Sequence, residues 1–488
     1  MNRPLLALLC TLVVVPAASA GGGMFVGAAE DGARSVDPVH SNAKMTLARL
    51  AGFDAIRMTS IWTPGETRPS DHELEVLRTA AAAAQLNGIR IVLSVYHRDQ
   101  RTTPRTTAAR AEFASYVATI ASEVPWIADF IIGNEPNLNL FWMPQYNKKG
   151  KSLSPAAYLA LLAQTYDALK AVSPDVNVIG GSISPRGTDK PKGRRPTHSP
   201  SRFIPELGKA YRRSGRWLPV MDAFAFHPYL IPSRLPPTFR HKARKNTTIA
   251  LSDYDKLVNA LAEAFDGTAQ PGSELPIVYD EFGYQSVIPF EKESLYTNLD
   301  APAAWDAIPE SLQAVYYRKA LAIAQCQPTV AGMLLFHVTD EFDARAWQSG
   351  LYYADDTPKT SLAGVRRAAL AARDGTLGRC PAARAKRVNP LREVVFAGTE
   401  VTVTCDRPCI YAARLVPIEP SEVVTAIDLL TEAGTPVQGV LGVGAQTAVP
   451  LAAAPVAPTT YQVMVRVFEL GRPGTAVVRF SEPFTVAG

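Results

Sequence analysis

The sequence contains little cysteine and little net charge, and it lacks several motifs that define common enzyme classes. Five Cys among 488 residues are too few for a disulfide knot. Lys and Arg number 50 against 45 Asp and Glu, and this small surplus argues against a dedicated nucleic-acid binder. Neither a Gly-x-Ser-x-Gly elbow nor a P-loop is present. What remains is a packed globular chain, 47% hydrophobic, with room for two or three domains.

The sequence also lacks an apolar run long enough to cross a bilayer. The most conspicuous run, residues 5–15, follows Arg3 and leads to the small residues Ala-Ser-Ala at 18–20. A basic start, a short apolar stretch and a small-residue cleavage site are typical of a secretory signal peptide. We therefore expect residues 1–20 to be removed and the mature protein to be secreted, without a membrane span.

Between about residues 23 and 372, short apolar runs alternate with segments that carry helix signals, such as Ser70 with Glu73 in a capping box and Gly88 as a stop. Eight strand-like runs are present: 24–28, 55–59, 89–96, 127–133, 176–182, 221–227, 277–279 and 332–338. Strands that alternate with helices indicate parallel strands joined by crossovers. Eight such units predict an α/β fold of the (β/α)8 TIM barrel type. An open doubly wound sheet is the alternative, but no Gly-rich loop follows the first run.

The pattern changes after the barrel. Residues 401–404 and 461–467 alternate with period two, and short strands of this kind are separated by Gly, Pro and Ala-rich turns. We expect this part to be a structural appendage, since it offers few aromatic residues as a sugar platform. The predicted organisation is a signal peptide at 1–20, a catalytic barrel at 21–372, a linker at 373–391 and a small Ig-like all-β sandwich at 392–488.

Four cysteines remain once Cys10 leaves with the signal peptide, and an even number in an oxidising compartment predicts disulfides. Cys326 precedes the eighth strand-like run and Cys380 follows the last helical segment, so both should lie at the N-terminal face of the barrel and pair there. Cys405 and Cys409 should pair locally. A zinc site is the weaker alternative, because this pair has no second pair at ligand spacing and no nearby His.

Two carboxylates lie at the ends of strand-like runs, the positions at which a barrel has its catalytic residues. The fourth run ends in Gly-Asn-Glu-Pro-Asn at 133–137, and the seventh ends in Tyr-Asp-Glu-Phe-Gly at 279–283. The C-terminal ends of barrel strands share one rim, so Glu135 and Glu281 should face one site. Two carboxylates that flank one bond are what glycoside hydrolysis requires. The alternative is that both are acids of surface loops.

These segments resemble clan A retaining glycoside hydrolases, and they are most similar to glycoside hydrolase family 39 and to family 5-like cellulase barrels. The resemblance covers the barrel, roughly three quarters of the chain. The segments that carry it are 133–137 with Leu138, Phe141 and Trp142 (acid/base motif), 279–283 (nucleophile strand), 53–57 (second strand with Arg57), 225–229 (sixth strand) and 347–351 (before the last helix).

The resemblance implies a role for each of these polar residues. Glu135 would be the general acid and then the general base, and Glu281 would be the nucleophile, kept ionised by Arg57. Asn134 would bind the sugar 2-hydroxyl. Adjacent strand residues point to opposite faces, so we expect only one of Asp280 and Glu281 to enter the site. The clan pattern favours Glu281.

Aromatic and imidazole side chains near strand ends complete the predicted site. His337 stands where many clan members carry a Trp platform at the end of the eighth strand. His227 could instead ligate a metal, but no other His lies within a few residues, so we expect neither a metal nor a cofactor. The residues expected to bind substrate, besides Asn134 and Arg57, are Trp62, His97, Trp142, His227, Tyr229 and His337, and Tyr96 is a further candidate for stacking.

Two loops of the predicted rim are strongly basic, which points to an anionic glycan as substrate. The alternative is that these are solvated loops without a specific ligand. Their cationic side chains are Arg186, Lys190, Lys192, Arg194, Arg195 and Arg202 after the fifth run, and Arg234, Arg240, Lys242, Arg244 and Lys245 after the sixth.

The sequence thus predicts a secreted, monomeric, retaining glycosidase that cleaves O-glycosidic bonds of a poly- or oligosaccharide by double displacement. We expect no nucleic-acid partner. The alternative is a non-catalytic carbohydrate- or cell-wall-binding surface protein on the same barrel. The presence of Asn134 and Arg57 together with both carboxylates favours the enzyme.

Overall fold

The computed structural model describes residues 24–173, 176–242, 246–300, 306–378 and 380, and parts of the C-terminal region. Those parts are 392–397, 400–405, 409–417, 427–428, 438–442, 445–450, 460–469, 472–481 and 484–485. The predicted signal peptide and residues 381–391 of the predicted linker lie outside the described residues. No helix within the described ranges is long and apolar enough to cross a membrane.

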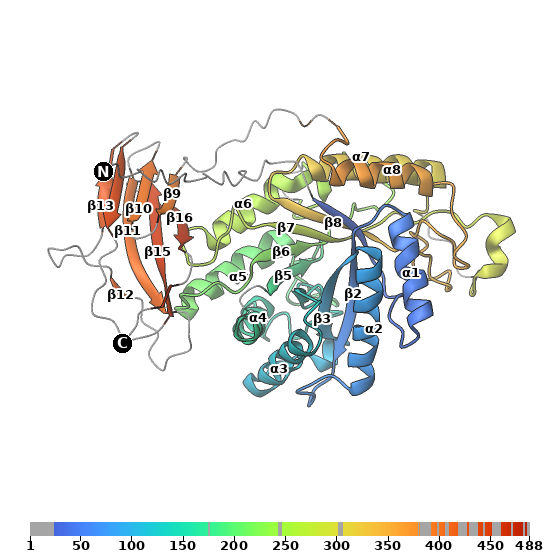
Figure 1. Cartoon of the computed structure of the whole chain (residues 1–488), viewed down its shortest axis with the longest axis horizontal. Helices are drawn as coiled ribbons and strands as arrows, with labels where there is room; N and C mark the ends of the chain where they lie inside the picture. Colours follow the sequence, from blue (N-terminus) through green and yellow to red (C-terminus); the bar gives the residue numbers. More distant parts are fainter. Residues whose placement is uncertain are drawn as a thin grey trace, which may run out of the picture.

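Eight parallel strands form a closed barrel, which confirms the predicted TIM barrel (Figure 1). They pair in chain order, and β1 closes the ring by pairing with β8. The strands are β1 (Phe25–Ala29), β2 (Ala55–Trp62), β3 (Arg90–His97), β4 (Asp129–Ile132), β5 (Asn177–Ile183), β6 (Ala223–Phe226), β7 (Ile277–Phe282) and β8 (Val330–Phe336). Each overlaps one of the runs expected from the sequence.

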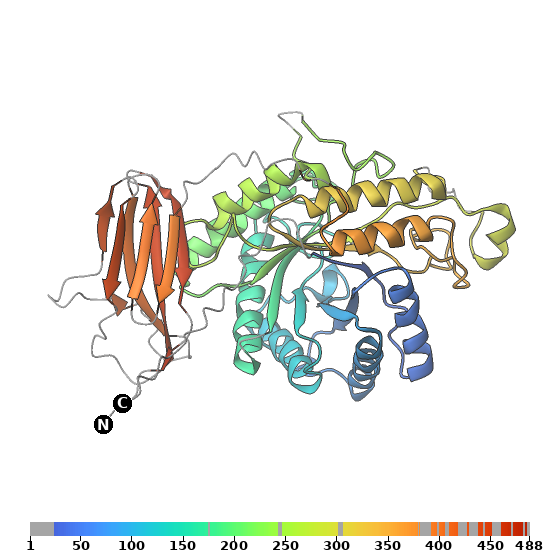
Figure 2. The same ribbon diagram turned by 45° about the horizontal axis from the view of Figure 1, so that its top comes forward.

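Helices follow the strands and surround them, as the turned view in Figure 2 shows. They are α1 (Pro38–Leu50), α2 (Asp71–Asn87), α3 (Thr107–Glu123), α4 (Ser154–Val172), α5 (Pro200–Ser214), α6 (Tyr254–Phe265), α7 (Glu310–Gln325) and α8 (Leu362–Arg373), with short 3-10 turns η1 (Gln100–Thr102), η2 (Leu251–Asp253) and η3 (Phe290–Leu295). The Ser70 hydroxyl accepts from the Glu73 amide at 3.1 Å, and Gly88 ends α2 with a φ of 63°. The Glu73 carboxylate instead binds Arg34 and Ser60, so only half of the predicted capping box forms.

Small and branched apolar side chains fill the inside of the barrel. They are Val92, Ile131, Ile179, Ala223, Ala225 and Val278. Gly27 permits close packing of β1 on β2, since a Cβ there would lie 1.9 Å from the Ala55 carbonyl oxygen. Because the interior is plugged in this way, polar chemistry is confined to the rim above it.

The described C-terminal strands form two antiparallel sheets. One has the order β14-β10-β9 and the other β12-β11-β15-β16, with β13 on β11 and β17 on β15. Valines of β10 and β15 belong to one buried cluster, while the Ig-like sandwich itself stays a prediction. The strands are β9 (Arg392–Ala397), β10 (Glu400–Cys405), β11 (Cys409–Pro417), β12 (Ile427–Asp428), β13 (Gln438–Leu441), β14 (Gln446–Pro450), β15 (Thr460–Glu469), β16 (Arg472–Phe480) and β17 (Phe484–Thr485).

Both predicted disulfides are present. Cys326, at the end of α7, is bonded to Cys380, 54 residues later and beyond α8. Cys405 is bonded to Cys409. The first bond fastens the last β/α unit at the end of the barrel where the strands begin.

Candidate active site

The backbone after β4 turns sharply to present Glu135 to the rim. Gly133 has a φ of 89°, which glycine adopts at low cost, and a Cβ there would lie 3.0 Å from the Tyr158 ring. Glu135 itself has a φ of 39°, and its amide donates to the Ser182 carbonyl on β5 at 2.8 Å. The neighbouring strand therefore holds this strained residue in place.

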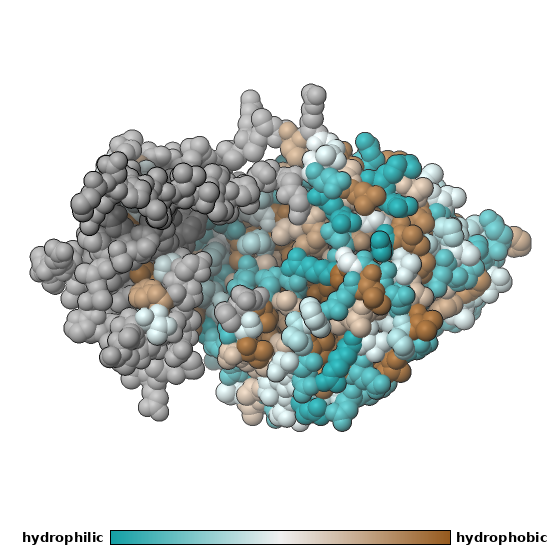
Figure 3. Space-filling view, viewed as in Figure 1, coloured by the Kyte–Doolittle hydropathy of each residue, from teal (hydrophilic) through white to brown (hydrophobic). Residues whose placement is uncertain are grey.

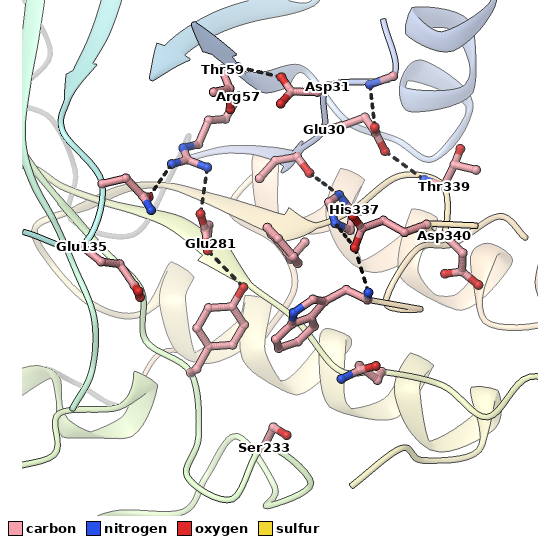
Figure 4. Close-up of a pocket in the computed structure, with 18 of the residues that line it drawn as sticks. Glu30, Asp31, Arg57, Thr59, Glu135, Ser233, Glu281, His337, Thr339 and Asp340 are labelled. Carbon is pink, nitrogen blue, oxygen red and sulfur yellow. Dashed lines mark hydrogen bonds and ion pairs between the residues drawn. The ribbon is translucent and has the colours of Figure 1, made fainter. Parts of the chain in front are cut away.

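Glu281, near the end of β7, faces Glu135 across the buried imidazole of His227. His227 Nδ1 lies 3.0 Å from Glu135 Oε1 and 3.5 Å from Glu281 Oε2. Because one nitrogen contacts both oxygens, they are separated by no more than the sum of these distances, 6.5 Å. The two carboxylates are thus brought together at one rim (Figure 4).

Arg57, within β2, holds the other side of Glu281. Its Nη1 donates to Glu281 Oε1 at 2.9 Å, and its Nη2 donates to Asn134 Oδ1 at 3.0 Å and to Ser94 Oγ at 3.1 Å. Burial disfavours the guanidinium charge, but Glu281 and Asp280 outweigh it and raise the pKa of Arg57. A permanent positive charge therefore lies beside Glu281 (Figure 4).

Asp280 departs from the expectation that it would point away from the site. Its Oδ2 lies 3.2 Å from His227 Nε2, 2.8 Å from Ser182 Oγ and 3.5 Å from Arg57 Nε. Adjacent side chains reach the same two cations because the register of β7 against β8 shifts between Tyr279 and Phe282. Only Glu281 of the two lines the cavity, whereas Asp280 is fully buried beneath it.

The neighbouring carboxylates hold His227 in its charged form. Burial opposes the imidazolium charge, but Glu281 and Asp280 outweigh burial, so the pKa of His227 is raised well above its ordinary value. Burial likewise would raise the pKa of Asp280, but His227 and Arg57 outweigh it and lower that pKa. Both shifts favour the ionised pair, in which His227 donates from both ring nitrogens.

The rim encloses a cavity of about 1190 Å³ that contains most of the predicted site. The predicted residues that line it are Arg57, Asn134, Glu135, Tyr229, Glu281 and His337. The Tyr229 hydroxyl donates to Glu281 Oε2 at 3.4 Å, and His337 Nδ1 lies 3.1 Å from the Ala29 carbonyl oxygen. His227 lies directly below and contacts both carboxylates.

Trp62, His97 and Trp142 do not line the cavity, contrary to the prediction that they bind substrate. Trp62 is fully buried against Phe113, on the helix side of β2. His97 and Trp142 pack edge to face, with ring centroids 5.5 Å apart, and are 3% and 1% exposed. Burial lowers the pKa of His97 to about 4. These three side chains belong to the core.

Other aromatic side chains line the cavity instead. Trp347, from the loop after β8, lies 5.5 Å from the Tyr229 ring and 5.3 Å from the Phe336 ring, centroid to centroid. Phe141, Phe342 and Tyr96, the further candidate for stacking, complete this set. Trp347 and Phe141 lie in segments that carry the family resemblance, so their place in those motifs could have indicated them.

Acidic side chains outnumber Lys and Arg in the lining. Lys44, Arg57 and Arg186 are the Lys and Arg side chains among the lining residues. Arg186 is thus the one member of the two basic loops that lines the cavity, and Arg244 and Lys245 lie outside the described residues. The carboxylates that line it are Glu30, Asp31, Glu135, Glu281, Asp306, Asp340, Glu341, Asp355 and Asp356.

Nothing in the described ranges gathers three His, Cys, Asp or Glu side chains in a geometry that could hold a metal ion.

No protein-family model matches the chain, and no curated protein sequence matches it. Among solved structures, a GH39 enzyme from Xanthomonas axonopodis pv. citri is 14% identical, with a TM-score of 0.45 over 88% of this chain and 93% of that one. A GH5_18 enzyme from Streptomyces cattleya is 14% identical, with a TM-score of 0.48 over 72% of this chain and 81% of that one. A calcium-binding mutant of Bacteroides uniformis beta-glucuronidase 2 is 12% identical (TM-score 0.46, 95% of this chain), and this chain spans 45% of its length.

Proposed function

We propose that the chain is a retaining glycosidase that hydrolyses O-glycosidic bonds of a poly- or oligosaccharide. The observation that carries this proposal is the shared contact of Glu135 and Glu281 with His227 Nδ1, at 3.0 and 3.5 Å. It brings a potential acid and a potential nucleophile to one cavity, with Arg57 bound to Glu281. The GH39 and GH5_18 structures described above have the printed names of glycoside hydrolases, which is consistent with this proposal.

The double-displacement mechanism follows from these groups. The Glu281 carboxylate attacks the anomeric carbon, the bond from that carbon to the leaving oxygen breaks, and Glu135 transfers its proton to that oxygen. Glu135, now a carboxylate, then takes a proton from water while the water oxygen attacks the anomeric carbon and releases Glu281. Asn134, fixed by Arg57 Nη2 at 3.0 Å, keeps its amide nitrogen for the sugar 2-hydroxyl.

The short carboxylate separation supports retention of configuration. Retaining enzymes hold the two carboxyl groups about 5–5.5 Å apart, whereas inverting enzymes need about 6.5–9.5 Å to admit a water. The separation between Glu135 Oε1 and Glu281 Oε2 is at most 6.5 Å, the lower edge of the inverting range, which favours retention.

An anionic glycan would have to bind largely outside the cavity, because the lining is acidic. The β5–α5 loop offers Lys190, Lys192, Arg194 and Arg195, all exposed. We therefore place contacts with an anionic chain on that loop, and the cleaved unit itself in the acidic cavity. Replacing these four residues together should weaken turnover of an acidic polysaccharide at low salt and leave a neutral one unchanged.

The remaining parts of the proposal concern the whole chain. We propose a secreted monomer with its catalytic barrel at 21–372, a linker at 373–391 and an Ig-like sandwich at 392–488. Two disulfides support an oxidising compartment. On the face seen in Figure 3, hydrophobic residues of the barrel are scattered among hydrophilic ones, as is normal for a protein surface.

The test is a panel of aryl glycosides and polysaccharides offered to the purified mature chain, with the product anomer followed by NMR. Turnover with retained configuration supports the proposal. A product of inverted configuration rejects double displacement. Saturable binding of a glycan without any turnover would favour the non-catalytic carbohydrate-binding alternative.

A further inference from the structure

Asp280 is an ionised side chain at the centre of the site that the double-displacement mechanism does not use. Its side chain is fully buried, and it does not line the cavity. Its Oδ2 contacts Ser182 Oγ at 2.8 Å and His227 Nε2 at 3.2 Å, and it lies 3.5 Å from Arg57 Nε. Substrate therefore cannot reach this carboxylate without displacing His227 or Arg57.

Among the charged side chains that contact His227 or Arg57, the charges balance only if Asp280 is counted. When Glu135 carries the proton for the leaving group, Asp280 and Glu281 are balanced by Arg57 and His227. After the first step Glu281 is a neutral ester and Glu135 is a carboxylate, so the sum is again zero. An uncompensated charge in such a buried site is costly. Asp280 keeps its negative charge throughout, whereas in the first step Glu281 loses its charge and Glu135 gains one.

We propose, on the basis of the glycosidase function above, that Asp280 is a positioning residue: it is the permanent counter-ion that keeps His227 an imidazolium throughout the reaction. Its contact with Nε2 leaves Nδ1–H to be donated between the two catalytic carboxylates. Asp280 acts through His227 and does not touch the reacting atoms.

The charged form of His227 decides where the proton of Glu135 resides. His227 Nδ1 lies 3.0 Å from Glu135 Oε1. If Nδ1 carries a hydrogen, Oε1 must accept it, and the proton for the leaving group resides on Oε2. A neutral imidazole with a lone pair at Nδ1 would instead accept the proton of Glu135 and withhold it from the substrate.

The groups that face His227 come from several elements. Glu135 follows β4, Ser182 belongs to β5, and Asp280 and Glu281 belong to β7. Tyr229, two residues on, packs edge to face on the ring. The substitution Asp280→Asn removes one of these charges and preserves the shape of the side chain. His227 should then lose its proton about 1–3 pH units lower, the usual effect of removing one opposite charge.

Two measurements test this. The imidazole titration of His227 is followed by NMR on ¹³C-histidine-labelled protein and assigned by loss of its signal in His227→Gln. The alkaline limb of kcat/KM is followed with an aryl glycoside, since that limb reports ionisations of the free enzyme. We expect His227 to stay charged above pH 7 in the wild-type protein. In Asp280→Asn, both the titration and the alkaline limb should move to lower pH by about one unit or more.

Ser182→Ala is the matched control, because it removes the hydrogen bonds of the hydroxyl with Asp280 Oδ2 and His227 Nε2 without removing charge. Ser182→Ala should lower kcat without shifting the alkaline limb of the kcat/KM profile along the pH axis. A wild-type His227 that loses its proton below pH 6 overturns the proposal, even where Asp280→Asn fails to fold. An unmoved titration in Asp280→Asn, or an equal shift in Ser182→Ala, also overturns it. The titration needs no turnover, so a wild-type chain that cleaves no glycoside rejects the proposed function separately.

Discussion

Lys359 and Asp340 form an ion pair with their side chains almost completely buried: Lys359 Nζ lies 2.7 Å from Asp340 Oδ2, and each side chain is 1% exposed. The ammonium also donates to Ser286 Oγ at 2.7 Å and to the Gln348 carbonyl at 3.2 Å. Burial raises the pKa of Asp340 and lowers that of Lys359. The bond from Lys359 to Ser286 ties the loop after β8 to the loop after β7, and both loops contribute to the cavity wall.

Removing the cation of this pair should destabilise the barrel strongly. Lys359→Met keeps the length of the side chain and leaves Asp340 as an unpaired buried acid. The free energy of unfolding should fall by about 3–5 kcal/mol, measured by urea denaturation. Lys292→Met is the control, since Lys292 is partly exposed and 3.3 Å from Asp355, and it should cost less than about 1 kcal/mol. Equal losses in the two variants would contradict the structural role of the buried pair.

Removing the proposed nucleophile should abolish turnover. In Glu281→Ala no carboxylate can form the glycosyl ester, and azide should enter the vacated space and restore part of the activity. The azide product should have inverted configuration, because a single displacement replaces two. Robust activity of this variant without azide would remove Glu281 from the mechanism.

Removing the proposed acid should give a different signature. Glu135→Ala should slow turnover by about 10²–10⁴-fold on substrates whose leaving group needs a proton. Aryl glycosides with acidic phenols should be much less affected in their first step, and azide should yield a product of retained configuration. An equal loss on good and poor leaving groups would show that Glu135 is not the proton donor.

Buried His97 should make the protein less stable in acid. Its pKa of about 4 in the folded chain lies below the ordinary value of 6.5, so the unfolded chain binds the proton more readily. Its contribution to the free energy of unfolding is complete above pH 6.5 and falls as the pH drops toward 4, by about 3 kcal/mol. His97→Asn should flatten this part of the stability profile in urea titrations. His72→Asn, at an exposed position, should leave it unchanged.

Trp347 should contribute to substrate binding. Its ring lies in the cavity wall beside Tyr229, where a sugar ring could stack on it. Trp347→Ala should raise KM about 3- to 10-fold with little change in kcat, since the ring touches no reacting atom. Trp126→Ala, at a residue 72% exposed and outside the cavity, should leave KM unchanged.

The strand-helix pattern predicted the barrel and the rim, because parallel strands of a barrel all end at one face. Trp62 and His97 were expected in the site because side-chain parity along their strands was not applied. Arg57 faces the site, and Trp62 lies five residues further along the same strand, so it points to the helices. Tyr96 lines the cavity, and its neighbour His97 therefore points the other way. Applied along β2 and β3, parity would have assigned Arg57 and Tyr96 to the site and Trp62 and His97 to the core.

The same rule misleads at β7. Parity predicts that Asp280 and Glu281 lie on opposite faces, yet both reach Arg57 and His227. The cause is an irregular register between Tyr279 and Phe282, and no residue type in that stretch indicates it. Trp142 lies in a loop, where parity gives no guidance. The charged lining likewise depends on how the loops after β1 and β8 fold back, which local sequence does not specify.

Because β1 pairs with β8, the barrel can close only late in the synthesis of the chain. Phe25 pairs with Gly332, so nearly the whole barrel must be synthesised before its first strand finds its second neighbour. Until then one edge of β1 stays unpaired. Glu281, on β7, is synthesised only shortly before β8, so its contact with Arg57 also forms late. A chain that ends before β8 therefore lacks the second partner of β1 and cannot close the barrel.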